Sequence, residues 1–357
     1  MLDSFFKPKS VAVVGASREE GKTGHSILSN IINYKFPGQI FPVNPKASEL
    51  LGLKTFPSLE KIDGTIDLAI IVIPPKFIPP VLDDCAKKNI KAAIIISAGF
   101  KETGAEGARL ENEVASKAKE LGIRLLGPNC LGLIDTNSNL NASFAKGMPP
   151  KGRIAFFSQS GALCTAILDW AIGSNVGFSK FISLGNKADL SEIDLLEHLA
   201  DDDETSVILG YLEGIENGSA FMNAARMAVK KKPVILIKAG GTDAGARAAS
   251  SHTGTLAGSE KAFHAAFLQA GIIRAMSIEE LFDYAIIFAE QPLPKGNRLA
   301  IITNAGGPGI IAADAVENTK GIELAQFSND TIDNLRQKLP PTAGLFNPVD
   351  IIGDARS

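Results

Sequence analysis

The sequence is poor in the residues that form disulfide frameworks and metal sites. Its 357 residues include three cysteines and four histidines. No C-x-x-C pair is present, and an odd, sparse set of cysteines builds no disulfide framework, so we expect a cytoplasmic protein. With so few cysteine and histidine side chains, the sequence predicts no zinc site and no other metal site in this chain.

Long hydrophobic runs and a strong net charge are missing as well. No stretch reaches the about eighteen apolar residues that a membrane-spanning helix needs, and the first residues lack the apolar core of a signal peptide. The formal net charge of −3 gives no reason to expect a nucleic acid or a membrane as partner. Hydrophobic residues make up 45% of the chain and charged residues 21%, a composition typical of folded domains with real cores.

Residues 10–130 alternate between short apolar runs and amphipathic segments. The runs are β-branched and nearly continuous, as is typical of buried parallel strands. They lie at residues 10–14, 40–43, 68–73, 92–96 and 123–126. Amphipathic segments between them, such as 79–88 and 107–121, predict helices. The pattern indicates an α/β fold with a doubly wound parallel sheet.

The first predicted strand runs into a turn that begins with Gly15, Ala16 and Ser17 and reaches Gly24. It resembles a nucleotide-binding turn but departs from G-x-G-x-x-G, because Ser17 stands at the second glycine position and the loop is longer. A turn of this kind is weak evidence for a dinucleotide site by itself.

The second predicted strand ends at Asn44 and Lys46, where an NAD site usually carries an acidic residue for the ribose hydroxyls. A lysine suits an extra phosphate near the ribose, as in NADP or the 3′-phosphate of coenzyme A. The alternative is a solvated loop lysine, which is the commoner fate of this residue type.

Three further predicted strands end in turn sequences. The turn residues are Pro74 and Pro75 after the third strand, Ser97, Ala98 and Gly99 after the fourth, and Asn129 after the fifth. Open α/β sheets bind ligands at the carboxyl ends of their strands. Each turn taken singly is an ordinary turn, but together they indicate a ligand site at this edge of the sheet.

A second α/β set follows residues 137–151, a polar segment in which we expect a domain boundary. Its strand candidates are residues 153–157, 177–183, 205–212 and 233–238. The first leads into Ser160 and Gly161, which open a predicted helix whose free N–H groups would form an anion cradle. The third ends at Glu213.

The fourth strand of this set leads into a loop of small residues with one histidine, Ser250 to Ser259. Imidazole can accept a phosphoryl group on nitrogen, and glycines let N–H groups approach phosphate oxygens. His252, Thr253 and Gly254 are therefore candidate phosphate-site residues, with Glu213 as the carboxylate that would fix the imidazole tautomer. The alternatives are a surface loop with an incidental histidine and a solvated glutamate.

The other three histidines are weaker candidates. His198 and His264 lie in predicted helices, where we expect them to pack. His25 lies at the start of the first predicted helix and could line a ligand.

A third block begins near residue 297. Residues 298–303 predict a strand, 304–309 a glycine-rich turn and the following residues a helix to about residue 317. A short strand near 322–325 and a helix near 330–335 follow. Two or three strands cannot close such a sheet, so we expect an incomplete third domain, truncated or completed by strands from elsewhere.

The strand-end turns, in this order and spacing, resemble the coenzyme A-binding domain of the nucleoside-diphosphate-forming acyl-CoA synthetases, which share their design with the α subunit of succinyl-CoA synthetase. The resemblance continues through the second set and the third block. It implies a Rossmann-like coenzyme A-binding domain (1–136), a flavodoxin-like phosphohistidine domain (150–291) and the start of a third flavodoxin-like domain (297–357).

In that family the S-x-S-G helix start faces the phosphate, the strand-end glutamate orients the histidine, and the histidine carries the phosphoryl group. Ser160, Gly161, Glu213 and His252 occupy those places here. The resemblance thus implies the α part of an ADP-forming acetyl-CoA synthetase, which converts acyl-CoA, ADP and phosphate into acid, coenzyme A and ATP.

Neither an ATP-grasp module nor the complete P-loop motif G-x-x-x-x-G-K-[ST] is present. ADP or ATP with Mg²⁺ is therefore expected on an ATP-grasp β subunit or domain, in an α2β2 assembly. Two other functions stay open: a non-catalytic coenzyme A sensor fused to an acetyltransferase, and an NADP-dependent oxidoreductase. Glu213 with His252 counts against the first, and the altered glycine turn against the second.

Overall fold

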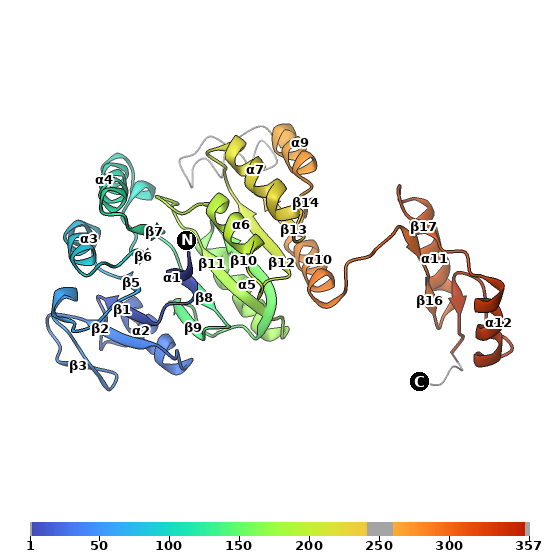
Figure 1. Ribbon diagram of the computed structural model, residues 1–357, viewed down its shortest axis with the longest axis horizontal. Helices are drawn as coiled ribbons and strands as arrows, with labels where there is room; N and C mark the ends of the chain where they lie inside the picture. Colours follow the sequence, from blue (N-terminus) through green and yellow to red (C-terminus); the bar gives the residue numbers. More distant parts are fainter. Residues whose placement is uncertain (1, 241–259, 354–357) are drawn as a thin grey trace. The chain divides into compact units, whose positions relative to one another are not determined.

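The computed structural model describes residues 2–240 and 260–353 of the chain. His252, Thr253 and Gly254 lie outside the described residues. The chain divides into two units, Met1–Gln291 and Pro292–Ser357, which are coloured blue to orange and orange to red in Figure 1.

The first sheet of unit Met1–Gln291 has five parallel strands in the order β2-β1-β5-β6-β7. Their bounds are Ser10–Val14 for β1, Gln39–Val43 for β2, Leu68–Ile71 for β5, Ala92–Ile95 for β6 and Arg124–Leu126 for β7. All residues of β1, β5 and β6 are buried, because helices cover both faces. The five predicted strands are confirmed, and the strand order reverses between β1 and β5.

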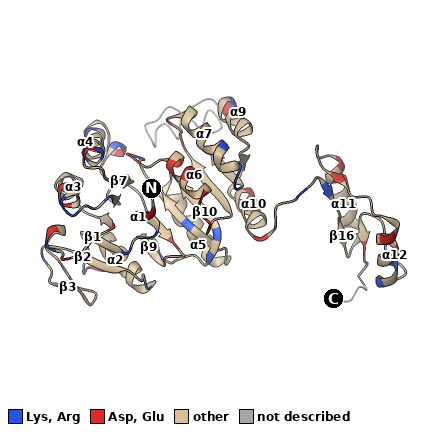
Figure 2. Cartoon of the chain, viewed as in Figure 1, with Lys and Arg blue, Asp and Glu red and all other residues tan. Residues whose placement is uncertain are grey.

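The helices of this domain bury one face each. They are α1 (Asp3–Phe6), α2 (Thr23–Asn33), α3 (Ile78–Lys87) and α4 (Ala105–Leu121). The smaller elements are the hairpin β3 (Glu49–Leu50) and β4 (Leu53–Lys54) and the 3-10 turns η1 (Leu59–Lys61), η2 (Pro75–Phe77) and η3 (Lys101–Thr103). Acidic and basic residues are interspersed on the exposed faces, as α4 shows in Figure 2.

The second sheet has seven strands in the order β14-β13-β12-β10-β11-β8-β9. The parallel strands are β10 (Lys151–Ser158), β11 (Phe178–Ser183), β12 (Val207–Leu212), β13 (Val234–Lys238) and β14 (Ile273–Arg274). Strand β8 (Gly132–Asp135) pairs antiparallel with β11, and β9 (Leu140–Ser143) antiparallel with β8. The order of the parallel strands reverses between β10 and β12, so this sheet has its own switch point.

Residues 137–151, where we expected a boundary, hold strand β9. All four of its residues are buried. Its polar side chains satisfy one another, because Asn141 Oδ1 accepts hydrogen bonds from Ser143 N at 3.2 Å and Ser143 Oγ at 2.6 Å. Asn30 of α2 donates to Ser143 O at 2.8 Å and Ala145 O at 2.9 Å. A buried strand with paired polar side chains lacks the apolar signal by which strands are recognised in a sequence.

Among the described residues, five helices flank the second sheet: α5 (Gly161–Gly173), α6 (Glu192–Ala200), α7 (Gly218–Val229), α9 (Glu260–Ala270) and α10 (Ile278–Glu290). The prediction for His198 is confirmed, since its ring stacks on Phe6 of α1 at 4.8 Å between centroids. The prediction for His264 is wrong, because His264 is exposed on α9. Only every third or fourth residue of that helix, such as Phe267 and Ala270, faces the core.

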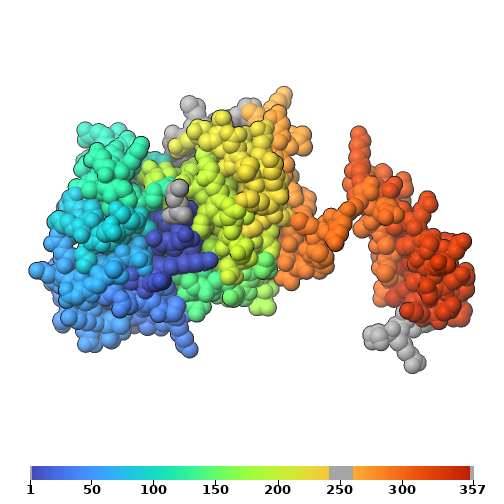
Figure 3. Space-filling model, viewed as in Figure 1, coloured from blue at the N-terminus to red at the C-terminus, as the bar shows by residue number. Residues whose placement is uncertain are grey.

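Helix α1 lies at the junction of the two domains, as the dark blue atoms in Figure 3 show. Beneath it, Lys180 of β11 is fully buried, with Nζ 2.6 Å from Asp202 Oδ2, 3.5 Å from Asp135 Oδ2 and 5.6 Å from the ring centroid of Phe6. Burial by itself raises the pKa of Asp202, but hydrogen bonds from Lys180 and Thr205 outweigh it and lower the pKa below its usual value. The pair thus contributes stability above the usual carboxyl pKa, and this contribution is lost as the pH falls through the lowered one.

Lys180→Met is expected to lower the free energy of unfolding by about 3–5 kcal/mol, because it leaves two buried carboxylates without their cation. Urea unfolding followed by circular dichroism measures the effect. Lys231→Met is the matched control, since Lys231 pairs with Asp201 at the surface and such pairs contribute about 0–1 kcal/mol. If both variants lost the same free energy of unfolding, burial of the Lys180 ion pairs would not make them more important for stability than a surface pair.

Unit Pro292–Ser357 consists of β15 (Arg298–Leu299), β16 (Ile302–Thr303), α11 (Gly306–Glu317), β17 (Glu323–Leu324), α12 (Asn329–Lys338) and β18 (Val349–Asp350). The predicted strand at 298–303 is split in two. Its first half pairs with β17 and its second half with β18, both in parallel. Across residues 2–240 and 260–353, no helix is both long and apolar enough to cross a membrane.

Candidate active site

A cavity of about 1030 Å³ lies in unit Met1–Gln291 between the carboxyl ends of the two sheets. Both sheets therefore present a switch point to the same space, the place where open α/β sheets bind ligands. Eight of the predicted site residues line it: Pro74, Pro75, Ser97, Ala98 and Asn129 from the first domain, and Ser160, Gly161 and Glu213 from the second. Residues separated by more than 100 positions in the sequence thus share one cavity.

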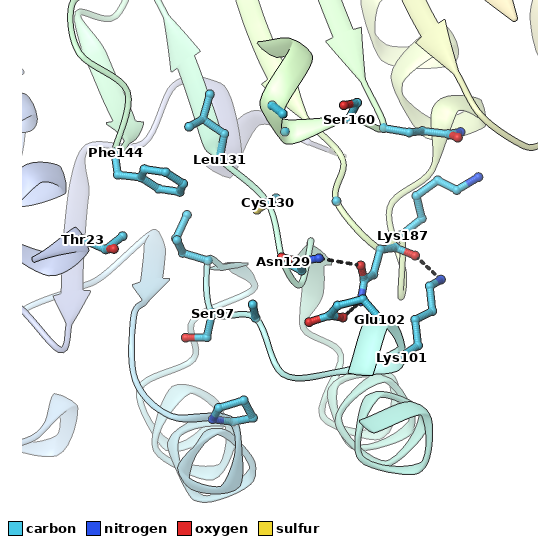
Figure 4. A pocket seen from close by; sticks show the side chains of 18 of the residues that line it. Thr23, Ser97, Lys101, Glu102, Asn129, Cys130, Leu131, Phe144, Ser160 and Lys187 are labelled. Carbon is cyan, nitrogen blue, oxygen red and sulfur yellow. Dashed lines mark hydrogen bonds between the residues drawn. The ribbon is translucent and has the colours of Figure 1, made fainter. Parts of the chain in front are cut away.

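The cavity has an apolar side and a polar side. Figure 4 shows Phe144, Leu131 and Thr23 on one side and Lys187, Lys101 and Glu102 on the other. Phe144 is 41% exposed, and its amide donates to Leu131 O at 3.3 Å. The two sides suit a ligand with an apolar arm and a charged end.

The glycine turn after β1 lies beside the cavity, although its predicted residues are not among the lining ones. Gly15 has φ +93°, and a Cβ there would lie 2.2 Å from Val72 O. A Cβ on Gly24 would lie 2.1 Å from Gly15 O. Both glycines are therefore needed for close backbone approach, and they set the start of α2, whose first residue Thr23 does line the cavity.

The remaining predicted residues of the first domain brace or flank this turn. Asn44 Nδ2 donates to Ala16 O at 2.7 Å, and Asn44 Oδ1 accepts from Lys46 N at 2.8 Å. Ser17 Oγ accepts from Glu19 N at 3.1 Å. The Lys46 side chain is exposed, so its ammonium group is accessible to a ligand that lies over the turn. Gly99 borders a second, smaller depression with Arg109 and Glu113.

Helix α5 directs its N-terminus at the cavity. Ser160 is its N-cap and accepts from Leu163 N at 3.3 Å, while Ser160 N donates to Ser158 Oγ at 3.0 Å. A Cβ on Gly161 would meet only Ser183 Oγ, at 3.9 Å. The first turn of the helix is thus open toward the cavity, and its free N–H groups and dipole favour an anion there.

A polar network joins the two domains at the other end of the cavity. Asn186 Nδ2 donates to Glu102 Oε2 at 2.6 Å and to Glu111 Oε2 at 2.7 Å, and Asn129 Nδ2 donates to Asn186 Oδ1 at 3.2 Å. Lys101 Nζ lies 3.4 Å from Glu111 Oε1 and donates to Asn186 O. Burial raises the pKa of Glu102, but the hydrogen bonds from Asn186 and from backbone amides outweigh it, so the net pKa is lowered and the carboxyl stays ionised.

Cys130 lines the cavity without being a nucleophile. Its thiol is buried, and burial raises its pKa to about 12. A thiol with so high a pKa carries almost no thiolate at neutral pH. Covalent chemistry on sulfur is therefore not offered by this site, and within the described residues no group of His, Cys, Asp and Glu could hold a metal ion.

Sequence reasoning missed several side chains of the site. Gln159, Lys187 and Phe144 line the cavity, and Glu192 is buried behind it. Gln159 and Lys187 stand in strand-end turns, which is a usable signal. Glu192 and Phe144 gave none, because the first reads as an ordinary charge in the first turn of a helix and the second follows an unrecognised strand.

Three family models match the chain. A coenzyme A-binding domain covers residues 9–136, a succinyl-CoA ligase-like flavodoxin domain residues 151–288, and a ligase-CoA domain residues 299–356. The Rossmann-like, flavodoxin-like and third α/β domains of the fold prediction are thereby confirmed.

Curated relatives match over the whole chain. An acetate–CoA ligase (ADP-forming) I from Archaeoglobus fulgidus is 51% identical over 99% of this chain, which covers 51% of that protein. The α subunit of acetate–CoA ligase (ADP-forming) II from Pyrococcus furiosus is 49% identical over 100% of this chain, which covers 77% of that subunit. The chain thus spans about half the length of the first relative and about three quarters of the second.

A solved structure agrees with these relatives. The dinucleotide-forming acetyl-coenzyme A synthetase 1 of Ca. Korarchaeum cryptofilum, in complex with phosphate and ADP, superposes with a TM-score of 0.93 at 41% identity, over 99% of this chain and 76% of that one. Together with the order of the three matched domains, these similarities show that the chain belongs to the ADP-forming acetyl-CoA synthetase family and corresponds to its α-subunit-like part.

Proposed function

We propose that this chain is the α part of an ADP-forming acyl-CoA synthetase, with acetyl-CoA as its substrate. The overall reaction converts acyl-CoA, ADP and phosphate into the free acid, coenzyme A and ATP. The cavity shared by the two sheets is the observation that carries the proposal, because it brings the strand ends of the first domain and the N-terminus of helix α5 to one space. Family membership supports the same reaction class.

Coenzyme A would enter along the first domain. The turn from Gly15 through Ser17 to Gly24 would approach its phosphates through backbone amides, with Asn44 bracing the turn at Ala16 O. The strand ends at Pro74, Pro75, Ser97, Ala98, Gly99 and Asn129 would flank the pantetheine arm. Lys46 would pair with the 3′-phosphate, and the thioester would then reach the α5 helix start.

Lys46→Ala is expected to weaken the binding of coenzyme A by about tenfold or more. The binding of dephospho-coenzyme A should weaken much less, because only coenzyme A carries the 3′-phosphate. A lost charged contact is worth roughly 1.5–3 kcal/mol. Isothermal titration with both ligands measures the difference, and Lys119→Ala on the exposed end of α4 is the matched control. Equal weakening of both ligands would remove Lys46 from this role, and tight NAD binding would contradict the whole assignment.

The first chemical step would join phosphate to the acyl group. A phosphate oxygen attacks the thioester carbonyl, the C–S bond breaks, and coenzyme A leaves as a thiolate that takes up a proton. The N–H groups at Ser160 and Gly161 would hold the phosphate oxygens. The products of this step are an acyl phosphate and free coenzyme A.

The second step would transfer the phosphoryl group to His252. An imidazole nitrogen attacks phosphorus, the P–O bond to the acyl group breaks, and the carboxylate leaves. Glu213 would accept a hydrogen bond from the other ring nitrogen and stabilise the cationic ring. Thr253 and Gly254 would add donors to the bound phosphoryl group.

The third step would take place on a partner. Relatives of this chain are named as α subunits, which supports a β subunit, and we propose an ATP-grasp subunit or domain that holds ADP with Mg²⁺ in an α2β2 assembly. Phosphohistidine would then give its phosphoryl group to ADP.

The test is incubation of the protein with acetyl-CoA and radiolabelled phosphate. Acid-labile, base-stable label on the protein, with release of coenzyme A, is the expected result. Binding of coenzyme A without label, in the presence of the β subunit, would indicate a coenzyme A sensor instead.

A further inference from the structure

Two side chains, Gln159 and Lys187, hydrogen-bond the backbone of Glu213 and Gly214, and Glu192 holds both of these side chains. Gln159 Oε1 accepts from Glu213 N at 2.7 Å and from Gly214 N at 3.0 Å. Gly214 O accepts from Gln159 Nε2 at 2.9 Å and from Lys187 Nζ at 3.0 Å. Glu192 Oε2 closes the network, with Lys187 Nζ at 3.0 Å and Gln159 Nε2 at 3.3 Å. The N–H groups of Glu213 and Gly214 and the carbonyl group of Gly214 are thus all held by side chains from other segments.

The charged members of the network are buried. The side chain of Glu192 is 1% exposed and that of Lys187 9% exposed. A buried ion pair gains little stability over an apolar pair of the same size, because desolvation offsets the attraction. Stability alone is therefore a weak reason for a lysine at this position.

The backbone of Lys187 belongs to a turn that packs on the first domain. Lys187 has φ +57°. Its neighbours pair with the loop before Asn129, since Asn186 N donates to Pro128 O at 2.8 Å and Ala188 N to Gly127 O at 3.0 Å. A Cβ on Gly185 would lie 2.2 Å from Pro128 O. Lys187 therefore spans the cavity wall from the strand end of the first domain to that of the second.

We infer that Lys187 is a positioning residue, which ties the Gly127 to Asn129 loop to Gly214 O and thereby fixes the direction of the Glu213 carboxylate beside the α5 helix start. The inference rests on the proposed role of Glu213. Gln159 holds both N–H groups and also donates to Gly214 O, and Lys187 adds the second bond to that carbonyl while it holds Glu192. Loss of Lys187 removes one of the two bonds to Gly214 O and leaves the Glu192 carboxylate with Gln159 Nε2 as its remaining partner in this network. The Gln159 amide, which holds Glu213 N and Gly214 N, then loses its fixed position, so the Glu213 carboxylate loses its orientation while ligand binding by the first domain is retained.

Lys187→Met is expected to slow phosphoryl labelling of the protein at saturating phosphate by at least tenfold, roughly the effect of misaligning one hydrogen-bonded catalytic partner. The phosphate concentration at half-saturation and the coenzyme A dissociation constant should change by less than about twofold. Amide hydrogen exchange at Glu213 and Gly214 should become about threefold faster or more. Lys231→Met, which breaks the surface pair with Asp201, is the matched control for loss of a lysine.

The double variant Lys187→Met with Glu192→Met separates positioning from folding. It removes the unpaired buried carboxylate that the single variant leaves, so its melting temperature should return toward that of the unsubstituted protein. Labelling should stay at least tenfold slow. Labelling that recovers together with the melting temperature, or a single variant that labels at the original rate, would overturn the inference. No label on the unsubstituted protein would instead contradict the proposed function, and the exchange of Gly214 would still report whether Lys187 holds this peptide.

Discussion

His252→Ala is expected to abolish phosphoryl labelling from acetyl phosphate, or from acetyl-CoA with phosphate, while coenzyme A affinity stays unchanged. The expectation follows from the proposed chemistry, in which His252 is the phosphoryl acceptor. Cys130 is a neutral thiol, and the Ser160 hydroxyl caps α5. Coenzyme A binding should be retained because its expected site lies on the strand ends of the other domain. Mass spectrometry of the labelled peptide, with acid and base lability, gives the acceptor.

The controls for this variant are the other histidines and the carboxylate. His264→Ala on the exposed face of α9 and His25→Ala near Ser17 should both label as the unsubstituted protein does. Glu213→Gln should keep the fold and slow labelling by at least tenfold, equivalent to about 1.4 kcal/mol of barrier. Label on a serine or on His25, or no label at all with the β subunit present, would refute the phosphohistidine route.

ATP formation should be undetectable with this chain alone and restored by an ATP-grasp subunit. The sequence contains no complete G-x-x-x-x-G-K-[ST] motif, and eight of the expected coenzyme A and phosphate residues line the described cavity. A phosphoryl group on the histidine would therefore have no ADP to receive it. Purified chain with acetyl-CoA, phosphate, ADP and Mg²⁺ is assayed by luciferase, before and after addition of the β subunit of a close relative.

ATP formation that depends entirely on the β subunit would show that the nucleotide site lies on that subunit. His252→Ala with the β subunit added should remain inactive, which excludes ATP from a contaminating kinase. ATP produced by the homogeneous chain without any partner would reveal a nucleotide site in this sequence and would contradict the division of labour between the subunits.

The sequence by itself determined the α/β class, the five strands of the first sheet and strands β10 to β13 of the second. Continuous β-branched runs such as Leu68–Ile71 and Val234–Lys238 fold into fully buried parallel strands. Such strands are recognisable in a sequence, because a strand covered on both faces is apolar at nearly every position. It also determined the start of helix α5 at Ser160, since an N-cap serine followed by good helix formers is a local signal. The strands and the helix start depend mainly on residues that are close together in the chain, and their pattern can therefore be read from the sequence.

Only the tertiary structure decided which strand ends face each other and which side chains complete the site. Strand β9 stayed hidden because Asn141 and Ser143 satisfy their polar groups within the protein. The Lys187–Glu192–Gln159 network could not be predicted, because its bonds join turns after β10, β11 and β12 that are 27 to 55 positions apart. Burial of a charged pair is decided by the segments that pack over it, and a single sequence holds no record of that packing.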